Sequence, residues 1–497
     1  MAGHQSESVR NQACLQDRPA PGGPAVPETD GSPGEGRAHT LRGHLGVWSI
    51  VFMVVAAAAP LTVVAGVVPL GIGIGNGAAF PLTFVICCAT LLLFAVGFTR
   101  MTPHVPKAGA FYTYVRSSLG RPMGLGSAYL ALATYSAVML GVYGYIGAAT
   151  QELVFQYVGV TLPWWLYSAA VLLIVALLGY RHVELSGKVL GVLLICEVGI
   201  VVVFDLVVTV RGGGDSGLST ALLQPSQITS GSPGIALMFA IASFLGFEAT
   251  AVYRDEARDP DRTVPRATYL ALLLVGSFYA LSSWALVSAW GDQAAVKEAN
   301  ADPGNMLITA VERYLGSAGS HIVLFLLVSS IFAAILSFHN VAARYVFSLA
   351  NTGALPIGGG SSHPRHGSPH TASLVQSGLS LVMLVIFVVV GMDPVTQIFS
   401  WLVGTATLGV LVLMCLTCLA VVVFFRRTRV ERNVWATVVA PVLGLAGLLT
   451  CLILTLTNFP LLIGGSRGLA IGIEALLATF FVGGFVVAVV RRRHLTD

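Results

Sequence analysis

Long, continuously apolar runs recur along the whole chain, and they restrict its fold more than any other feature. Each run has roughly 20 residues, which is the length that an α-helix needs to cross ~30 Å of hydrocarbon. Of the 497 residues, 55% are hydrophobic and only 10% are charged, far too few to cover the surface of a soluble domain. The runs do not alternate as strands of a membrane β-barrel would. We therefore predict an all-α integral membrane protein.

We predict about twelve membrane-spanning helices, each bounded by Arg, Gly, Pro or aromatic residues. In chain order they cover residues 48–73, 78–98, 123–152, 163–180, 187–210, 233–253, 268–290, 320–349, 371–391, 394–423, 434–456 and 468–490.

Basic residues are concentrated in alternate connections between these spans. One set of connections, together with both chain ends, holds most of the Arg and Lys residues, whereas the other set holds only Arg211, Lys297, Arg313 and Arg467. Because cytoplasmic loops carry the excess of positive charge, we expect a multi-pass protein of the cytoplasmic membrane with both termini in the cytoplasm.

Three features that suggest other chemistry have ordinary explanations. His363, His366 and His370 lie in a low-complexity loop where a metal site is less well supported than a flexible connection. Cys415 and Cys418 fall inside an apolar run, where thiols serve as small packing groups. The glycines of 71–75 lack the Lys and Ser/Thr of a phosphate-binding loop. We expect no enzyme, no cofactor, no metal and no nucleic-acid partner.

Two of the predicted helices contain a weak point near the middle. In the first, four alanines precede Pro60, which has no backbone N–H to donate. In the sixth, Ser243-Phe-Leu-Gly246 lies at a comparable depth. Small residues also allow close helix packing, which explains either feature alone. Two interrupted helices in corresponding places indicate a transporter built from inverted repeats, with its substrate site at the interruptions.

The sequence around the second interruption resembles a known family. Gly246-Phe-Glu-Ala249, followed by the charged block 255–267, resembles the sixth helix and following loop of the amino acid–polyamine–organocation (APC) transporter superfamily. Supporting motifs stand in the same order as in that family at residues 106–114, 120–124 and 340–356. The first helix departs from the commonest Gly-Ser-Gly interruption of the family, which weakens any inference about the substrate.

The resemblance implies a LeuT-like five-plus-five inverted repeat in which helices 1 and 6 are broken at the membrane midplane. The corresponding division of the chain is a disordered cytoplasmic tail (1–43), a transporter core (44–423), a cytoplasmic loop (424–433), two accessory spans (434–490) and a cytoplasmic tail (491–497).

A substrate site at the interruptions would offer backbone N–H groups near Thr62 to Val64 to a carboxylate, and carbonyl groups near Ala57 to Ala59 and Ile241 to Ser243 to an ammonium group. On the third span, Tyr135, Met139 and Tyr143 share one face, which forms a wall of the site or simply packs. Phe244 is the expected lid. The candidate substrate-binding residues are Ala58, Ala59, Leu61, Thr62, Val63, Tyr135, Met139, Ile241, Ser243, Phe244, Leu245 and Gly246.

Acidic residues within the spans are candidates for ion coupling, because a buried charge is costly without a partner or water. We expect Glu197 or Glu248 to carry a proton, although Glu248 equally fits a structural hydrogen bond. Glu197 stands where several proton-coupled relatives carry a Lys. Because the residue differs, we do not assign the role of that Lys to Glu197. Asp205 and Glu474 lie farther towards the outside. Sodium is the competing coupling ion, with Ser337 as a possible ligand.

The charged block after the sixth span is a candidate gate. We expect Arg254, Asp255, Glu256, Pro260 and Pro265 to form a cytoplasmic gate loop in which the two prolines set the entry into the seventh span. Ion pairs with Arg116 or Arg121 are a further expectation. A solvated loop that obeys the positive-inside rule explains the charges alone.

The expected function is secondary active transport of amino acids by alternating access, with proton-coupled symport favoured. The partners are then a small amino acid or related amine, a coupling proton or sodium ion, and the lipid bilayer. The alternatives are a polyamine or organic-cation transporter, an amino acid exchanger and, less favoured, a membrane sensor that does not transport.

Overall fold

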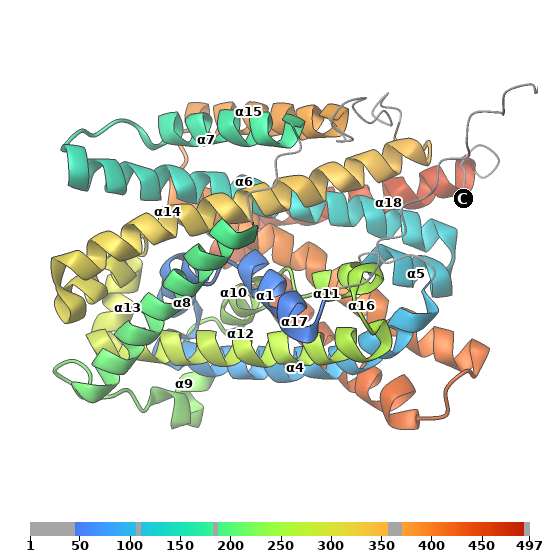
Figure 1. The fold of residues 1–497 in the computed structure, drawn as a ribbon, viewed down its shortest axis with the longest axis horizontal. Helices are drawn as coiled ribbons and strands as arrows, with labels where there is room; N and C mark the ends of the chain where they lie inside the picture. The colour runs from blue at the N-terminus through green and yellow to red at the C-terminus, as the bar shows by residue number, and fades with distance from the viewer. Residues whose placement is uncertain (1–44, 106–110, 182–186, 356–369, 492–497) are drawn as a thin grey trace, which may run out of the picture. The chain divides into compact units, whose positions relative to one another are not determined.

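The computed structural model describes residues 45–105, 111–181, 187–355 and 370–491, and its regular structure in these ranges is entirely helical (Figure 1). The α-helices are α1 (Val47–Ala57), α2 (Pro60–Thr62), α3 (Val68–Leu70), α4 (Phe80–Met101), α5 (Phe111–Leu119), α6 (Arg121–Val158), α7 (Trp164–Arg181), α8 (Gly187–Val210), α9 (Pro225–Ile228), α10 (Pro233–Ala242), α11 (Ala249–Val252), α12 (Pro260–Trp290), α13 (Asp292–Ala301), α14 (Met306–Asn351), α15 (His370–Val390), α16 (Ser400–Thr428), α17 (Ala440–Leu462) and α18 (Arg467–Val490).

Short π- and 3₁₀-helices complete several of these elements. They are η1 (Val63–Val67), η2 (Gly71–Asn76), η3 (Gly77–Ala79), η4 (Thr102–His104), η5 (Ala221–Leu223), η6 (Tyr253–Glu256), η7 (Pro394–Phe399) and η8 (Trp435–Val439). The helical stretch from Pro60 to Asn76 therefore combines α2, η1, α3 and η2.

The described part of the chain contains nine helical stretches that are long and apolar enough to cross a membrane. One of them, Val47–His104, includes both the first and the second expected span, and two shorter apolar helices, Trp164–Tyr180 and Pro233–Ala242, coincide with the fourth and with the start of the sixth. The all-α membrane fold is confirmed, while the count of twelve spans and the inverted repeat stay predictions.

The first expected span is interrupted where its sequence predicts. Helix α1 ends at Ala57, and Ala59 takes up the left-handed conformation (φ 46°, ψ 68°) before the helix resumes at Pro60. A proline ring disfavours the right-handed helical conformation in the residue before it, and proline itself fits the first position of a new helix. Pro60 thus accounts for both the end of one half and the start of the next.

The sixth expected span is also interrupted. Helix α10 ends at Ala242, and six residues in turns separate it from the short helix α11. Within these turns Gly246 has φ +105°, a conformation that residues with a side chain rarely adopt. The single glycine of the Ser-Phe-Leu-Gly sequence therefore makes the break possible.

The interrupted helices lie in the interior of the bundle. Helix α1 packs against α12, α8 and α14, whereas α10 packs against α17, α16, α4 and η2 (Figure 1). Helices α4 and α12 lie side by side, as do α7 and α15 (Figure 1). Large apolar side chains on α7, α8 and α15 remain exposed, for example Leu173 (67%), Leu206 (59%) and Val382 (57%), as expected of helices that face lipid.

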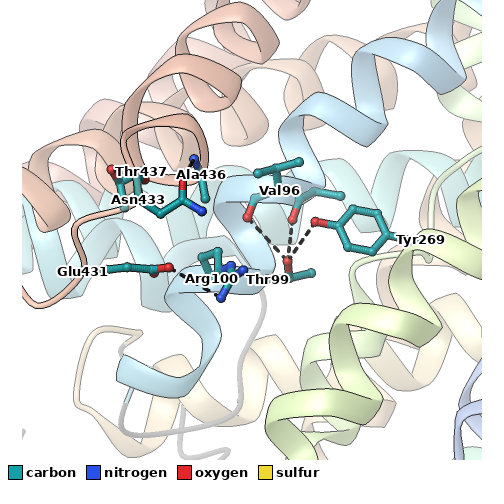
Figure 2. Close-up of polar contacts among 9 residues, drawn as sticks. Val96, Thr99, Arg100, Tyr269, Glu431, Asn433, Ala436 and Thr437 are labelled. Atoms are coloured by element: carbon teal, nitrogen blue, oxygen red, sulfur yellow. Dashed lines mark hydrogen bonds and ion pairs between the residues drawn. The ribbon is translucent and has the colours of Figure 1, made fainter.

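The last two spans attach to the core through close packing and through a polar contact. A Cβ atom placed on Gly97 of α4 would lie 2.5 Å from Pro441 of α17, so only glycine allows this approach. Figure 2 shows Arg100, at the end of α4, facing Glu431 in the connection after α16, with 3.5 Å between Nη1 and Oε1. In the same view the Thr99 hydroxyl lies 3.5 Å from that of Tyr269 on α12.

The expected start of the seventh helix is wrong. That helix begins at Pro260 and not near residue 268, because Pro260 occupies its first turn with Asp261 beside it, a favourable helix start. A charged loop is predicted there because residues 254–266 are mostly polar. In α14 a short helical part from Met306 is separated by Gly316 (φ 77°) from the part over residues 317–351, which begins close to the expected start of the eighth span at residue 320.

Candidate functional site

The two interrupted spans contact each other at three levels. At the breaks, a Cβ atom placed on Gly246 would lie 3.5 Å from the Cβ of Ala57. At one end the Ser232 N–H donates to the Gly75 carbonyl over 2.9 Å. At the other end the Arg258 N–H donates to the Leu45 carbonyl over 3.1 Å. The halves of spans one and six therefore run together through the bundle.

Ten of the predicted substrate-binding residues belong to the two breaks, and Tyr135 of α6 reaches Glu248 beside the second. In the described part of the chain no hydrogen bond joins Met139 to either break. Two are partly buried, Ala58 and Gly246, and the rest are buried: Ala59, Leu61, Thr62, Val63, Tyr135, Met139, Ile241, Ser243, Phe244 and Leu245. The Ser243 hydroxyl donates to the Phe239 carbonyl of its own helix over 2.9 Å. The Phe244 ring contacts Tyr279 of α12 edge-on, with 6.3 Å between centroids.

Glu248 is held at the break of span six by two donors from different elements. The Gly246 N–H donates to its Oε2 over 3.0 Å, and the Tyr135 hydroxyl of α6 donates to its Oε1. The side chain is only 4% exposed. The Tyr135 ring stacks in turn on Tyr345 of α14, with 5.6 Å between centroids. The carboxyl group thus connects α6, α14 and the broken span.

Glu197 of α8 is held at the break of span one. Its side chain is 5% exposed, and the Ser330 hydroxyl of α14 and the Leu61 N–H lie near its carboxyl group. The Thr62 hydroxyl donates to the same Ser330 oxygen over 3.1 Å. A free backbone N–H at the start of a helical stretch favours an anion, and here the protein supplies the anionic group itself.

Backbone groups around the break are less free than the sequence suggests. The Val63 N–H donates to the Ala59 carbonyl over 3.2 Å, so it is taken up within the helix. The Ala58 carbonyl accepts a hydrogen bond of 3.3 Å from the hydroxyl of Tyr279. Tyr279 is therefore a site residue that sequence reasoning missed, since an isolated Tyr in an apolar helix resembles any packing residue.

The other ionisable candidates lie elsewhere. Asp205 accepts a hydrogen bond of 2.7 Å from the Ser282 hydroxyl, two turns farther along α8 than Glu197, and its second oxygen is buried without a partner. Glu474 lines an apolar groove of about 260 Å³ between α6, α16, α17 and α18. Ser337 is partly buried on α14, seven residues after Ser330, which is the serine that contacts Glu197.

The charged block after span six is structured rather than looped. Arg254 pairs with Asp261 over 3.3 Å, and residues 253–256 form η6. Pro260 begins α12 as expected of an entry residue, but Pro265 lies inside that helix and makes no turn. Burial raises the pKa of Tyr114 on α5, and the nearby Arg254 guanidinium opposes this shift. The block packs against α11 and α12, while Asp255 and Glu256 are described by their backbone alone.

Cavities of unequal size lie towards the two ends of the bundle. A cavity of about 480 Å³ opens near the end of α6 and the start of η7, with Tyr145 among its lining residues. A Cβ atom placed on Gly66 would lie 2.6 Å from the Tyr145 ring, which also stacks on Phe399 with 4.9 Å between centroids. Near the start of α6, by contrast, a cavity lined by Tyr112 and Tyr345 has only about 70 Å³.

The cysteine and histidine motifs add no further site in the described ranges. Cys415 and Cys418 are free, buried thiols of α16. His370 begins α15, whereas His363 and His366 lie outside the described residues. No group of three His, Cys, Asp or Glu side chains in the described residues is arranged to hold a metal ion.

An all-helical membrane bundle with two interrupted, touching spans defines a class of membrane permease, and sequence comparison identifies the family. The chain belongs to the amino acid permease family, whose model matches residues 45–486.

Its relatives include transporters of different solutes. The chain is 22% identical to the low-affinity putrescine importer PlaP of Escherichia coli (strain K12) over 61% of its own length and 66% of the importer. It is 24% identical to the serine/threonine exchanger SteT of Bacillus subtilis (strain 168), over 60% of this chain and 66% of the exchanger. It is 23% identical to the branched-chain amino acid permease BcaP of Lactococcus lactis subsp. cremoris (strain MG1363), over 59% of this chain and 64% of the permease. The matched region thus spans just under two thirds of each relative.

Proposed function

We propose that this protein is a secondary active transporter that moves amino acids or related amines across the cytoplasmic membrane by alternating access. The observation that carries the proposal is the meeting of two broken helices at Gly246 and Ala57, each with a buried carboxyl group beside its break. Broken helices of this kind place backbone dipoles and carbonyl groups at membrane depth, where a polar solute needs them.

The substrate is proposed to lie between the breaks, in contact with the enclosed residues of α2, η1, α6 and α10. Small side chains at Ala58 and Ala59 bring the backbone within reach of a solute, and the carbonyl groups there suit an ammonium group. Phe244 borders this region on the α12 side, where it lies against Tyr279. Family relatives that carry amino acids or putrescine support a small solute with an amino group.

Alternating access is supported by the unequal cavities. The larger cavity lies at the end of α6 that is remote from Arg121, and by the positive-inside rule this is the outside. On the other side, two contacts are proposed to close the route from the breaks to the cytoplasm. They are the hydrogen bond from Tyr135 to Glu248 and the backbone hydrogen bond from Arg258 to Leu45. The proposed cycle loosens these inner contacts while the Tyr145 ring seals the outer cavity.

The coupling ion is proposed to be a proton carried by Glu197 or Glu248. Each carboxyl is buried beside neutral donors, and no basic side chain is among them. A carboxyl group in such surroundings gains or loses a proton when the donors move. Sodium coupling and exchange are the competing modes, and one of the relatives is an exchanger.

Uptake into proteoliposomes tests the function. The full-length protein is reconstituted and offered a panel of radiolabelled amino acids and amines under an inward pH gradient, an inward sodium gradient, or with unlabelled solute inside. Accumulation driven by the pH gradient is expected. A response to sodium alone would contradict proton coupling, uptake that depends only on internal solute would identify an exchanger, and no accumulation of any solute would favour the sensor.

A further inference from the structure

The cavity of about 480 Å³ that Tyr145 lines is strongly acidic, and the substrate site proposed above gives no reason for this. Its lining residues come from the second half of α6, the connection between α13 and α14, and the start of η7. Among them are the three carboxylates of Glu152, Asp302 and Asp393, and within the described part of the chain no Lys, Arg or His lines it.

Neutral donors hold these carboxylates in place. Gln156 donates to Glu152 over 3.2 Å, Asn305 donates to Asp302 over 3.1 Å, and the backbone N–H of Thr396 donates to Asp393 over 2.7 Å. In the described ranges no ion pair joins any of the three to a basic side chain. Their negative charges add up across a concave surface, which focuses the field and concentrates cations.

A second observation at the base of this cavity also points to a ligand. Tyr145 lines the cavity and is only 1% exposed, and its hydroxyl is buried without any hydrogen-bond partner. A buried hydroxyl is normally paired, so a donor that enters the cavity gains an unoccupied acceptor. The Phe155 side chain, 50% exposed, also lines the cavity, and an aromatic ring there can attract a cation.

We propose that this cavity is a vestibule that selects amines of net positive charge, such as alkyl diamines and cationic amino acids, over zwitterionic amino acids. The inference rests on the proposed transport function and specifies its substrate class. An ammonium group would pass the carboxylates of Glu152 and Asp302 and donate to the Tyr145 hydroxyl before it reaches the breaks.

The arrangement at the break of span one agrees with a cationic substrate. The Leu61 N–H, which would otherwise be offered to the carboxylate of a zwitterion, lies beside the Glu197 carboxyl group. When ionised, Glu197 repels a second carboxylate and attracts an ammonium group. A diamine has no carboxylate that needs a binding partner. Its ammonium groups can therefore interact with the carboxylates of the vestibule and with Glu197 at the break.

The test compares a dication with a zwitterion on the same protein. Purified full-length protein is titrated with putrescine and, separately, with serine, and uptake of both is measured in proteoliposomes. Glu152→Gln and Asp302→Asn are made singly and together. The matched control is Glu312→Gln, which alters an exposed carboxylate of α14 outside the cavity. Asp393 is left intact because it caps η7.

In the double variant, the dissociation constant and KM for putrescine are expected to rise by about ten-fold, with kcat unchanged, because electrostatic attraction is lost. The same constants for serine are expected to rise by less than about two-fold. Tyr145→Phe is expected to raise the dissociation constant for putrescine by about three-fold or more. In the unaltered protein, putrescine binding should weaken as salt rises from ~20 to ~200 mM, and the double variant should lose most of that dependence.

The outcomes separate this inference from the proposed function. Equal effects on putrescine and serine, or putrescine binding that is insensitive to salt in the unaltered protein, would overturn the vestibule while transport stands. The salt series needs no variant, so a variant that fails to fold does not remove the test. If the unaltered protein neither binds nor accumulates any amine or amino acid, both proposals fail together.

Discussion

The hydroxyl of Thr62 donates a hydrogen bond of 3.1 Å to the hydroxyl of Ser330, which links the resumed helix of span one to α14. The Ser330 hydroxyl also lies near Glu197, so a buried carboxyl sits beside the first break. Glu248 has the equivalent position beside the second break, where it is bonded to Tyr135. Each interruption of the backbone is therefore accompanied by one carboxyl group and a hydroxyl from a neighbouring helix.

Glu197→Gln is expected to abolish accumulation driven by a pH gradient while leaving exchange of internal for external solute within about three-fold of the unaltered protein. The amide has nearly the same size and its oxygen can still accept a hydrogen bond, but it neither gains nor loses a proton at physiological pH. The measurement is a comparison of gradient-driven uptake with counterflow in proteoliposomes. Full pH-driven accumulation by the variant would exclude Glu197 as the proton carrier.

Glu248→Gln and Tyr135→Phe address the other carboxyl. A hydrogen bond to a charged group contributes about 1.5–3 kcal/mol, so losing it is expected to slow uptake by about ten-fold or more. We expect a larger loss in Glu248→Gln, because the new amide turns a donor towards either the Gly246 N–H or the Tyr135 hydroxyl. Initial uptake rates are compared at equal amounts of reconstituted protein, with Glu312→Gln as the control. Unchanged rates in both variants would indicate a purely structural contact.

Gly246→Ala is expected to abolish uptake without removing the protein from the membrane. The φ of +105° is strained for alanine by about 1–3 kcal/mol, and relief of that strain would shift the break away from Ala57. Gly378→Ala in α15 is the control, since its new Cβ would meet no atom within 4 Å. Uptake and membrane abundance are measured together, and normal uptake by Gly246→Ala would argue against a fixed break there.

Ala59 provides a test in which adding a glycine is expected to preserve uptake. Because Ala59 is left-handed (φ 46°), Ala59→Gly is expected to retain uptake and to raise thermal stability slightly, while Ala59→Val is expected to lose uptake. β-Branched side chains are poorly tolerated in the left-handed region. Thermal unfolding and uptake of both variants are compared with the unaltered protein. Equal behaviour of the glycine and valine variants would mean that this conformation is unimportant.

Much of the architecture could be predicted from the sequence, because a bilayer permits few solutions. Runs of apolar residues identify spanning helices directly, and Pro60 and Gly246 interrupt helices for reasons that are local to the backbone. The start of the seventh helix was wrong because polar residues continue that helix back to Pro260.

Partners of side chains could not be predicted, since they depend on which helix faces come together. Tyr279 reaches the Ala58 carbonyl from a helix more than 200 positions away, and nothing in its local sequence distinguishes it from other buried tyrosines. Ser330 of α14 lies near Glu197 and was likewise not predicted, while Ser337 as a sodium ligand stays a prediction. Spacing within a helix predicts a face and not the partner opposite.

The most direct test of a substrate site at the breaks is protection of Ser243→Cys from a small thiol reagent by transported solute. The seven native cysteines are first replaced, and Glu312→Cys serves as the exposed control. A saturating concentration of solute is predicted to slow labelling at position 243 by about ten-fold or more, as expected for a solute that occupies the site, and to leave position 312 unchanged. Equal labelling rates at position 243 with and without transported solute would contradict a substrate site between the two broken helices.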